Sequence, residues 1–255
     1  MKLRAEILGI PVDGADVAAT LIAPDEPRPL QPAVLFVHGW GGSQAQYVAR
    51  ARAAARLGYL SMTLDLRGHA GTAQLFESVT REENLRDVLA AYDALAARGE
   101  VDGTQIALCG YSYGGYLAAI ASSLRQMRAL SLLAPALYKD AGWRMPKRKL
   151  HLEPDFAAYR HRTLRAIDNR ALRACAQFGG DVLLVEPEKD EVIPHAVVAN
   201  YAAAFAHARS LTYRVIDGAD HGLSEKRWDE SLTELLVGWL QTHAQAAELS
   251  NDPRL

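Results

Sequence analysis

The fold is decided by residues 105–117, with the sequence QIALCGYSYGGYL. This stretch begins with the short apolar run 106–109, which predicts a buried strand, and leads into residues 116–121, which are good helix formers. Between them, residues 110–114 match the pattern G-x-S-x-G. A strand that turns directly into a helix needs glycines where Cβ atoms would collide. The pattern therefore predicts a sharp turn that exposes the Ser112 hydroxyl at its tip.

Predicted strands and helices alternate along the rest of the chain. Asp13-Gly14 is a strong turn signal, and it predicts an antiparallel hairpin of residues 3–10 and 17–23. We expect further strands at 33–37, 59–64, 129–133, 182–185 and 211–216, and helices at 45–57, 81–98, 195–207 and 228–243. Thr80 and Glu83 predict a capping box at the second helix. The alternation predicts one α/β domain over residues 1–255, with an eight-stranded, mostly parallel sheet and helices on both faces.

Two other segments are predicted to be irregular. Residues 24–32 hold four prolines and should form a loop. Residues 141–180 contain no obvious strand and are rich in charge. We expect fraying of the C-terminal residues from 244 onward.

Composition excludes several functional classes. The net charge of −2 argues against a nucleic-acid-binding protein, because no basic field exists to hold phosphates. Cys109 and Cys175 give neither a disulfide framework nor zinc-ligand spacing. The N-terminus is too polar for a signal peptide. The sequence also contains no run of about 18 apolar residues, which a membrane span would need. We therefore expect a cytoplasmic protein with no membrane partner. The sequence leaves the oligomeric state open.

Three side chains could form a catalytic triad. The Ser112 hydroxyl is a weak nucleophile, so it needs a base and a third group that orients the base. His221 follows the last predicted strand in a glycine-containing loop, and Asp190 follows the strand before it. The chain order Ser, Asp, His is the one expected of a single hydrolase fold. All three residues are placed at carboxyl ends of strands, where such sheets bind ligands.

Four motifs together resemble the α/β-hydrolase superfamily, and within it the small serine esterases and the dienelactone-hydrolase-like and prolyl-oligopeptidase-like enzymes. Residues 38–42, HGWGG, resemble the oxyanion loop, and residues 110–114 the nucleophile elbow. Asp190 with 192–194, VIP, resembles the acid loop, and His221 with Gly222 the histidine loop. The resemblance implies an oxyanion hole formed by the backbone N–H groups of Trp40 and Tyr113. It also implies catalysis without a metal or an organic cofactor.

Two departures from the family pattern stand out. The family often has D-x-R-G-H-G-x-S after its fourth strand, whereas residues 65–72 read DLRGHAGT. Ala70 thus replaces a glycine, so we expect this loop to differ in shape. Residues 141–180 occupy the place of the family's lid, and their length predicts a small one.

Several residues have alternative interpretations. Glu186, Glu188, Glu191, Asp217 and Asp220 are rival acids near Asp190 or His221. We expect a structural role for His38 and exposed or locally bonded rings for His69, His151, His161 and His195. Tyr111, Trp143 and Met145 are candidates for the substrate pocket. Residues 139–173 hold ten Lys/Arg and four Asp/Glu, which indicates a solvated helix face rather than a field that steers carboxylate-bearing substrates.

The predicted function is that of a carboxylesterase, which cleaves small-molecule esters through an acyl-enzyme. A peptidase, an amidase or a lactone hydrolase with the same triad is the alternative. The sequence shows no β-propeller that could sort peptides, which favours esters. A binding protein on a hydrolase scaffold is the least favoured reading, since all three triad residues are present. The acyl and alcohol groups cannot be named from the sequence.

Overall fold

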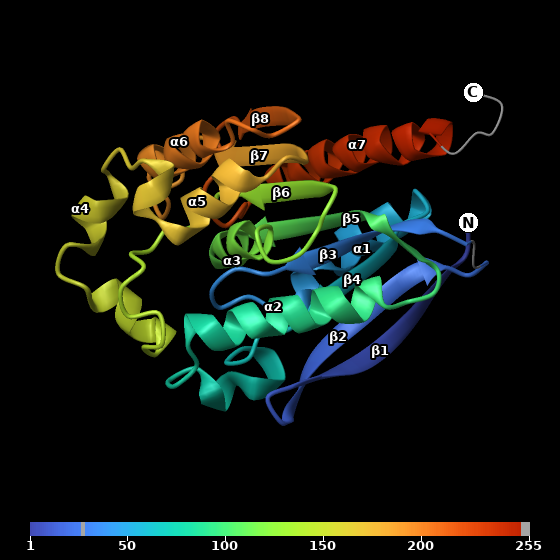
Figure 1. Ribbon diagram of the computed structural model, residues 1–255, viewed down its shortest axis with the longest axis horizontal. Coiled ribbons are helices and arrows are strands. Elements are labelled where there is room, and N and C mark those ends of the chain that lie inside the picture. Colours follow the sequence, from blue (N-terminus) through green and yellow to red (C-terminus); the bar gives the residue numbers. More distant parts are fainter. Residues whose placement is uncertain (27–28, 251–255) are drawn as a thin grey trace.

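A computed structural model describes residues 1–26 and 29–250. Within them, one eight-stranded sheet has the strand order β1-β2-β4-β3-β5-β6-β7-β8 (Figure 1). The strands are β1 (Leu3–Val12), β2 (Ala15–Pro24), β3 (Gln31–Val37), β4 (Leu60–Leu64), β5 (Val101–Tyr111), β6 (Ala129–Leu133), β7 (Asp181–Pro187) and β8 (Ser210–Ile216). β2 pairs antiparallel with both β1 and β4, and every other pair is parallel. The predicted hairpin and mostly parallel sheet are confirmed.

Helices cover both faces of this sheet. They are α1 (Val48–Arg56), α2 (Arg81–Ala96), α3 (Tyr113–Ala121), α4 (Phe156–Arg160), α5 (Arg170–Gln177), α6 (His195–Ala204) and α7 (Lys226–Ser250). Short 3₁₀ turns occur at η1 (Gln44–Tyr47), η2 (Ala70–Leu75), η3 (Lys147–Leu152) and η4 (Ala166–Asp168). α1 contacts α7 on one face, whereas α2 contacts α3, α3 contacts α5 and α5 contacts α6 on the other. The central strands are therefore buried on both sides, as their continuous apolar runs require.

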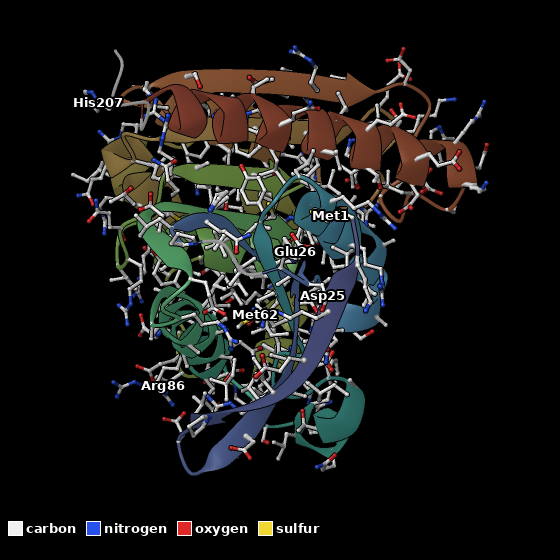
Figure 2. All side chains as sticks on the ribbon, turned by 90° about the vertical axis from the view of Figure 1, so that its right-hand side faces the viewer. Met1, Asp25, Glu26, Met62, Arg86 and His207 are labelled. Carbon is white, nitrogen blue, oxygen red and sulfur yellow. The ribbon has the colours of Figure 1, made fainter. Side chains whose placement is uncertain are left out.

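Local sequence signals set several of these elements. Asp13 and Gly14 both have positive φ, 53° and 82°, which suits the two-residue turn of the β1–β2 hairpin. The Asp13 carboxylate then anchors this turn to Arg67 at 2.8 Å and to Arg86 at 2.9 Å. Figure 2 labels Arg86 at the edge of the molecule, while Met62 of β4 is fully buried in the sheet.

The expected capping box is present at α2. The Glu83 amide donates to Thr80 Oγ1 at 3.2 Å, and the Thr80 amide donates to Glu83 Oε2 at 2.8 Å. These bonds satisfy two of the amides that a helix N-terminus leaves free. The prediction of this helix start from sequence is confirmed.

Residues 141–180 carry short helical turns, from η3 to α5, and no strand of the sheet. Figure 1 shows them at the end of the sheet opposite the N-terminus. Their treatment as a small lid stays a prediction, as does the single-domain assignment.

Two other segments predicted to be irregular are residues 24–32 and the residues from 244 onward. Part of the predicted loop 24–32 lies outside the described residues, at 27–28. α7 stays helical to Ser250, beyond the point at which we expected fraying, and residues 251–255 lie outside the described part. No helix among the described residues is long and apolar enough to cross a membrane. The cytoplasmic location stays a prediction.

Candidate active site

The turn between β5 and α3 holds Ser112 in a strained conformation, with φ 51° and ψ −113°. The turn is possible because neighbouring residues lack a Cβ atom. A Cβ on Gly110 would lie 2.5 Å from the Gly114 carbonyl oxygen, and a Cβ on Gly114 would lie 2.4 Å from the His38 carbonyl oxygen. The strand-to-helix turn that the sequence predicts is therefore formed by backbone contacts that only glycine permits.

Ser112, His221 and Asp190 meet at this turn. The Ser112 hydroxyl lies 3.1 Å from His221 Nε2, and His221 Nδ1 lies 2.7 Å from Asp190 Oδ2. The second Asp190 oxygen accepts the amides of Val192 and Ile193 at 2.8 and 2.7 Å. Because a carboxylate only accepts, His221 Nδ1 carries the proton and Nε2 is free to accept one from the hydroxyl. The arrangement can activate Ser112 as a nucleophile.

The rival acids either bind other groups or are exposed to solvent. Glu186 lies 2.9 Å from His195 Nδ1, and Glu188 accepts the Gly218 amide at 2.6 Å. Asp220 accepts the Ser224 amide at 2.9 Å. Glu191 and Asp217 are exposed, whereas the Asp190 side chain is only 3% exposed. Burial against His221 makes Asp190 the acid of this constellation.

Tyr111 contacts both the ring and the backbone of His221. Its ring stacks on the His221 ring with the centroids 5.2 Å apart and the planes 28° apart. Its hydroxyl donates to the His221 carbonyl oxygen. Burial raises the pKa of Tyr111, so the hydroxyl keeps its proton at mildly alkaline pH. Tyr111 also borders a cavity of about 210 Å³ beside Gly222 and Leu223. The structure thus places this predicted pocket residue against the histidine loop.

The loop after β3 lies directly against the elbow. A Cβ on Gly39 would lie 3.3 Å from the Ser112 Cβ. His38 holds this loop as expected: its Nδ1 donates to the Gly39 carbonyl at 2.8 Å, while its Nε2 accepts the Leu66 amide at 3.0 Å. Burial lowers the pKa of His38, in keeping with a neutral ring that both donates and accepts.

The two residues predicted to supply the oxyanion donors, Trp40 and Tyr113, are in contact through their rings, with the centroids 5.5 Å apart. Within residues 1–26 and 29–250, the backbone N–H groups of Trp40 and Tyr113 donate to no protein acceptor. Tyr113 is the first residue of α3, where a helix leaves its amides free and its dipole favours negative charge. Both amides are thus available to an incoming oxygen.

An aromatic cluster from residues 141–180 packs over Trp40. The His151 ring lies 4.8 Å from the Trp40 ring, and Phe156 stacks on Tyr138 at 5.7 Å. Arg160 lies over Phe156 at 4.9 Å and is only 8% exposed. Among the described residues it makes no hydrogen bond or ion pair, and burial lowers the pKa of Arg160.

The other two predicted pocket residues lie further along this segment. Trp143 is sandwiched between the guanidinium groups of Arg81, at 5.2 Å, and Arg170, at 4.4 Å. Met145 is 38% exposed and packs beside Gly142. Neither lines a cavity described here, and their role in substrate binding stays a prediction.

Sequence reasoning missed a group of buried basic residues. Lys147 and Arg160 belong to the stretch 139–173 that we expected to be solvated, yet Lys147 is fully buried. Arg81, at the start of α2, is also fully buried. His69 is buried as well. In addition to residues near it in sequence, it contacts Lys147, which is distant in sequence. No periodicity or motif marks these positions, because their partners come from distant segments.

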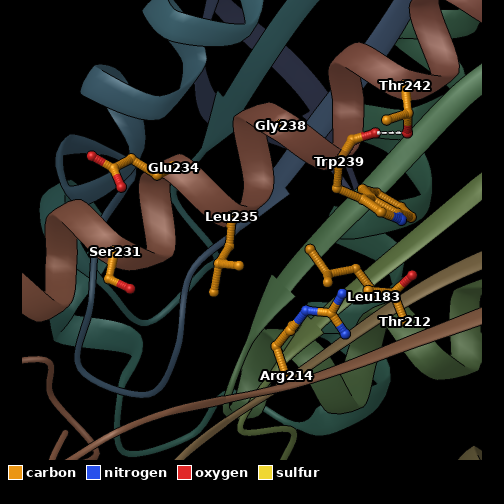
Figure 3. A pocket seen from close by; sticks show the side chains of 9 residues that line it. All are labelled: Leu183, Thr212, Arg214, Ser231, Glu234, Leu235, Gly238, Trp239 and Thr242. Carbon is orange, nitrogen blue, oxygen red and sulfur yellow. Dashed lines mark hydrogen bonds between the residues drawn. The ribbon is translucent and has the colours of Figure 1, made fainter.

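Two further cavities are present, of which the first borders the histidine loop. A groove of about 620 Å³ is lined by His221, Asp220, Trp228 and Lys189 among others. A second, of about 510 Å³, lies between α7 and strands β7 and β8, bordered by Trp239, Leu235 and Arg214 (Figure 3). The second contains no triad residue. Among the described residues, no group of three or more His, Cys, Asp or Glu side chains could hold a metal ion.

Comparison with known proteins identifies the family and the fold of the chain. The model of the prolyl oligopeptidase family matches residues 43–247. A search of curated proteins found no significant match. Among solved structures, Est1E from Butyrivibrio proteoclasticus with ferulic acid bound is 21% identical, with a TM-score of 0.73 over 92% of this chain and 98% of its own.

Two further solved structures show the same fold. A putative dienelactone hydrolase from Klebsiella pneumoniae is 17% identical, with a TM-score of 0.71 over 94% of this chain and 99% of its own. An acylaminoacyl peptidase from Pyrococcus horikoshii is 16% identical, with a TM-score of 0.72 over 94% of this chain and 42% of its own. The chain belongs to the prolyl oligopeptidase family, and its α/β-hydrolase fold is confirmed. Family membership supports a serine hydrolase without choosing among esters, amides and lactones.

Proposed function

We propose that this member of the prolyl oligopeptidase family is a carboxylesterase that cleaves small-molecule esters through an acyl-enzyme. The observation that carries the proposal is a chain of two hydrogen bonds. The first joins Ser112 Oγ and His221 Nε2 at 3.1 Å, and the second joins His221 Nδ1 and Asp190 Oδ2 at 2.7 Å. Similarity to Est1E, which was solved with ferulic acid bound, supports an ester substrate.

The mechanism follows from the positions of these groups. Ser112 attacks the ester carbonyl carbon while His221 Nε2 takes the hydroxyl proton, and Asp190 stabilises the resulting imidazolium. The amides of Trp40 and Tyr113 donate to the oxyanion of the tetrahedral intermediate. His221 then protonates the leaving alcohol. Water, activated by the same imidazole, releases the acid and restores Ser112.

The test is covalent labelling together with turnover. A fluorophosphonate probe should form an adduct at Ser112, and Ser112→Ala should lower kcat on p-nitrophenyl acetate by about 10⁶-fold. Ser224→Ala is a matched control, since Ser224 is exposed and bonds to Asp220 rather than to the triad. An unlabelled wild-type protein, or an alanine variant that turns over near the parent rate, contradicts the proposal.

A substrate panel separates esters from the alternatives. Short-chain esters, aromatic esters, lactones and amino-acyl anilides would be compared by kcat/KM under identical conditions. We expect the esters to exceed the anilides, because an alcohol leaves more easily than an amine when the triad is the same. A higher kcat/KM for anilides would make the protein a peptidase or an amidase, and a preference for lactones would make it a lactone hydrolase.

A further inference from the structure

Lys147 of η3 places a charged group against the side chains of the two residues that form the proposed oxyanion hole. Its side chain is fully buried, and its Nζ lies over three aromatic rings: Tyr113 at 4.9 Å, Trp40 at 5.0 Å and Phe76 at 5.6 Å. The Lys147 amide also donates to the Val79 carbonyl oxygen at 2.8 Å, which holds the start of η3 in place. Lys147 therefore connects the segment 141–180 to Trp40 and Tyr113, the residues of the proposed oxyanion hole.

Hydrogen bonds around Nζ show how this lysine is held. Asn84 Nδ2 donates to the Arg67 carbonyl and to Asp87, both at 3.0 Å, so Asn84 Oδ1 is an acceptor. Lys147 Nζ donates to this oxygen at 3.2 Å. His69 Nδ1 lies 3.2 Å from the Leu66 carbonyl, which makes it the protonated nitrogen. Lys147 Nζ lies 3.1 Å from His69 Nε2 and 3.3 Å from His69 Nδ1, so it sits against the ring, and Nε2 is the nitrogen that can accept from it.

The aromatic faces identify the form of Lys147 that fits the cage. Nζ donates to Asn84 Oδ1 and lies against the His69 ring, and the three aromatic faces around it are negative. A neutral amine would turn a lone pair toward those faces instead. The cage therefore stabilises the ammonium form over the neutral amine.

Burial opposes this stabilisation. Burial lowers the pKa of Lys147 to about 7, while the negative charge of Asp87 raises it. Asp87 is itself paired with Arg67 at 2.6 Å, so it compensates Lys147 only in part. The other titratable groups that face the cage are neutral: burial lowers the pKa of His69 to about 3 and that of His38 as well, and raises the pKa of Tyr113. The charge on Lys147 is thus poised to change near neutral pH.

Two of the caging residues, Trp40 and Tyr113, are the ones whose backbone N–H groups are the proposed oxyanion donors and donate to no acceptor among the described residues. We propose that Lys147 is a positioning residue for the oxyanion hole, whose ammonium holds the rings of Trp40 and Tyr113 and so keeps their backbone N–H groups aimed at the developing oxyanion. The inference rests on the proposed serine hydrolase function. The lysine touches no substrate, and its effect passes through the two residues it holds. Misplacement of reacting groups by about 1 Å can cost 10²-fold in rate.

The first test compares Lys147→Met with Lys149→Met. Methionine keeps the length of the side chain and removes the charge, and Lys149 is an exposed lysine of the same turn. We expect Lys147→Met to lower both the rate of fluorophosphonate labelling and kcat on an ester by roughly 10- to 100-fold with KM little changed. Lys149→Met should match the wild type in both measurements. Lys147→Arg keeps the charge and should recover part of the lost rate if it folds.

The second test measures the pH dependence of labelling, first in the wild type. In the wild type, the labelling rate should fall as pH rises through about 7, because Lys147 loses its proton there. Lys147→Met should lack this alkaline fall. If the wild type is labelled and its rate is flat over that rise in pH, or if a folded Lys147→Met is labelled within twofold of the wild-type rate, the inference is overturned and the esterase proposal stands. If the wild type is not labelled at all, both fail.

Discussion

The nucleophile elbow and the segment 141–180 meet at Trp40 and Tyr113, but different kinds of interaction hold them in place. Around Ser112, backbone packs on backbone, with Gly110 and Gly114 at distances that exclude any Cβ. The segment is instead held by long basic side chains that reach from one element to another: Lys147 of the segment contacts His69, and Arg81 of α2 donates to the carbonyl oxygens of Lys139 and Ala141.

This difference determines how each region responds to change. Backbone contacts at the elbow leave no room for adjustment, so a substitution there must move main chain. Side-chain anchors of the segment can be removed one at a time, at the cost of each unsatisfied partner. We therefore expect changes at the elbow to abolish activity, and changes in the segment to produce graded effects on stability.

The largest effect is expected from Gly114→Ala. The added Cβ would lie 2.4 Å from the carbonyl oxygens of both Val37 and His38, which are backbone atoms and cannot rotate away. We expect loss of measurable esterase activity and a fall in the free energy of unfolding of about 3 kcal/mol or more. Urea unfolding and ester turnover would measure the two effects.

Gly103→Ala is the control for this substitution. Gly103 has no heavy atom within 4 Å of an added Cβ, so an alanine should fit in place. Its stability should stay within about 0.5 kcal/mol of the wild type. An active, stable Gly114→Ala protein would show that the elbow can relax, and the contrast between the two regions would disappear.

An intermediate effect is expected from Arg81→Met. The buried Arg81 guanidinium donates to the Lys139 carbonyl at 2.7 Å and to the Ala141 carbonyl at 2.6 Å, and methionine leaves both without a donor. We expect a loss of about 2–4 kcal/mol in the free energy of unfolding. Limited proteolysis should also cut faster within residues 141–180, because their first turn loses its anchor.

Arg144→Met serves for comparison with Arg81→Met. Arg144 is 82% exposed and forms a surface ion pair with Glu82 at 3.0 Å, which contributes at most about 1 kcal/mol. Equal proteolysis of wild type and Arg81→Met would show that the segment is held by something other than Arg81.

The smallest effect, with the opposite sign, is expected from Arg160→Met. Burial lowers the pKa of Arg160 and the charge of Asp190 raises it, but no carboxylate among the described residues forms an ion pair with the guanidinium, whose Nε has no partner. Because Asp190 offsets the burial only in part, removing the guanidinium should stabilise the protein by up to about 1 kcal/mol, which is a rise in Tm of roughly 2–4 °C. Arg162→Met, at an exposed site two residues away, should leave the Tm unchanged. A lower Tm for Arg160→Met would mean that its guanidinium is compensated.

The same contrast explains what could be predicted from sequence. The elbow, the capping box of Thr80 and the Asp13-Gly14 turn are encoded by residues adjacent in sequence, so local patterns predicted them. Asp190 and His221 followed from their positions after β7 and before α7, because strand ends meet at one edge of a parallel sheet. These placements needed no knowledge of side-chain contacts.

The buried basic residues could not be predicted in this way. Lys147 is one of several lysines and arginines in a charged stretch, and only the distant rings of Trp40 and Tyr113 distinguish it. Ala70 illustrates a milder case. It takes φ 45°, a left-handed conformation that favours glycine, and the expected difference in loop shape from the family stays a prediction.

Both cysteines are shielded from solvent, and this has a practical consequence. Burial raises the pKa of Cys109 to about 12 and also raises that of Cys175, so neither thiol presents a reactive thiolate at neutral pH. A cysteine introduced on the outer side of η3, at Lys149, would be the only readily alkylated sulfur among the described residues. A fluorophore attached there could follow the movements of this turn in the otherwise native protein.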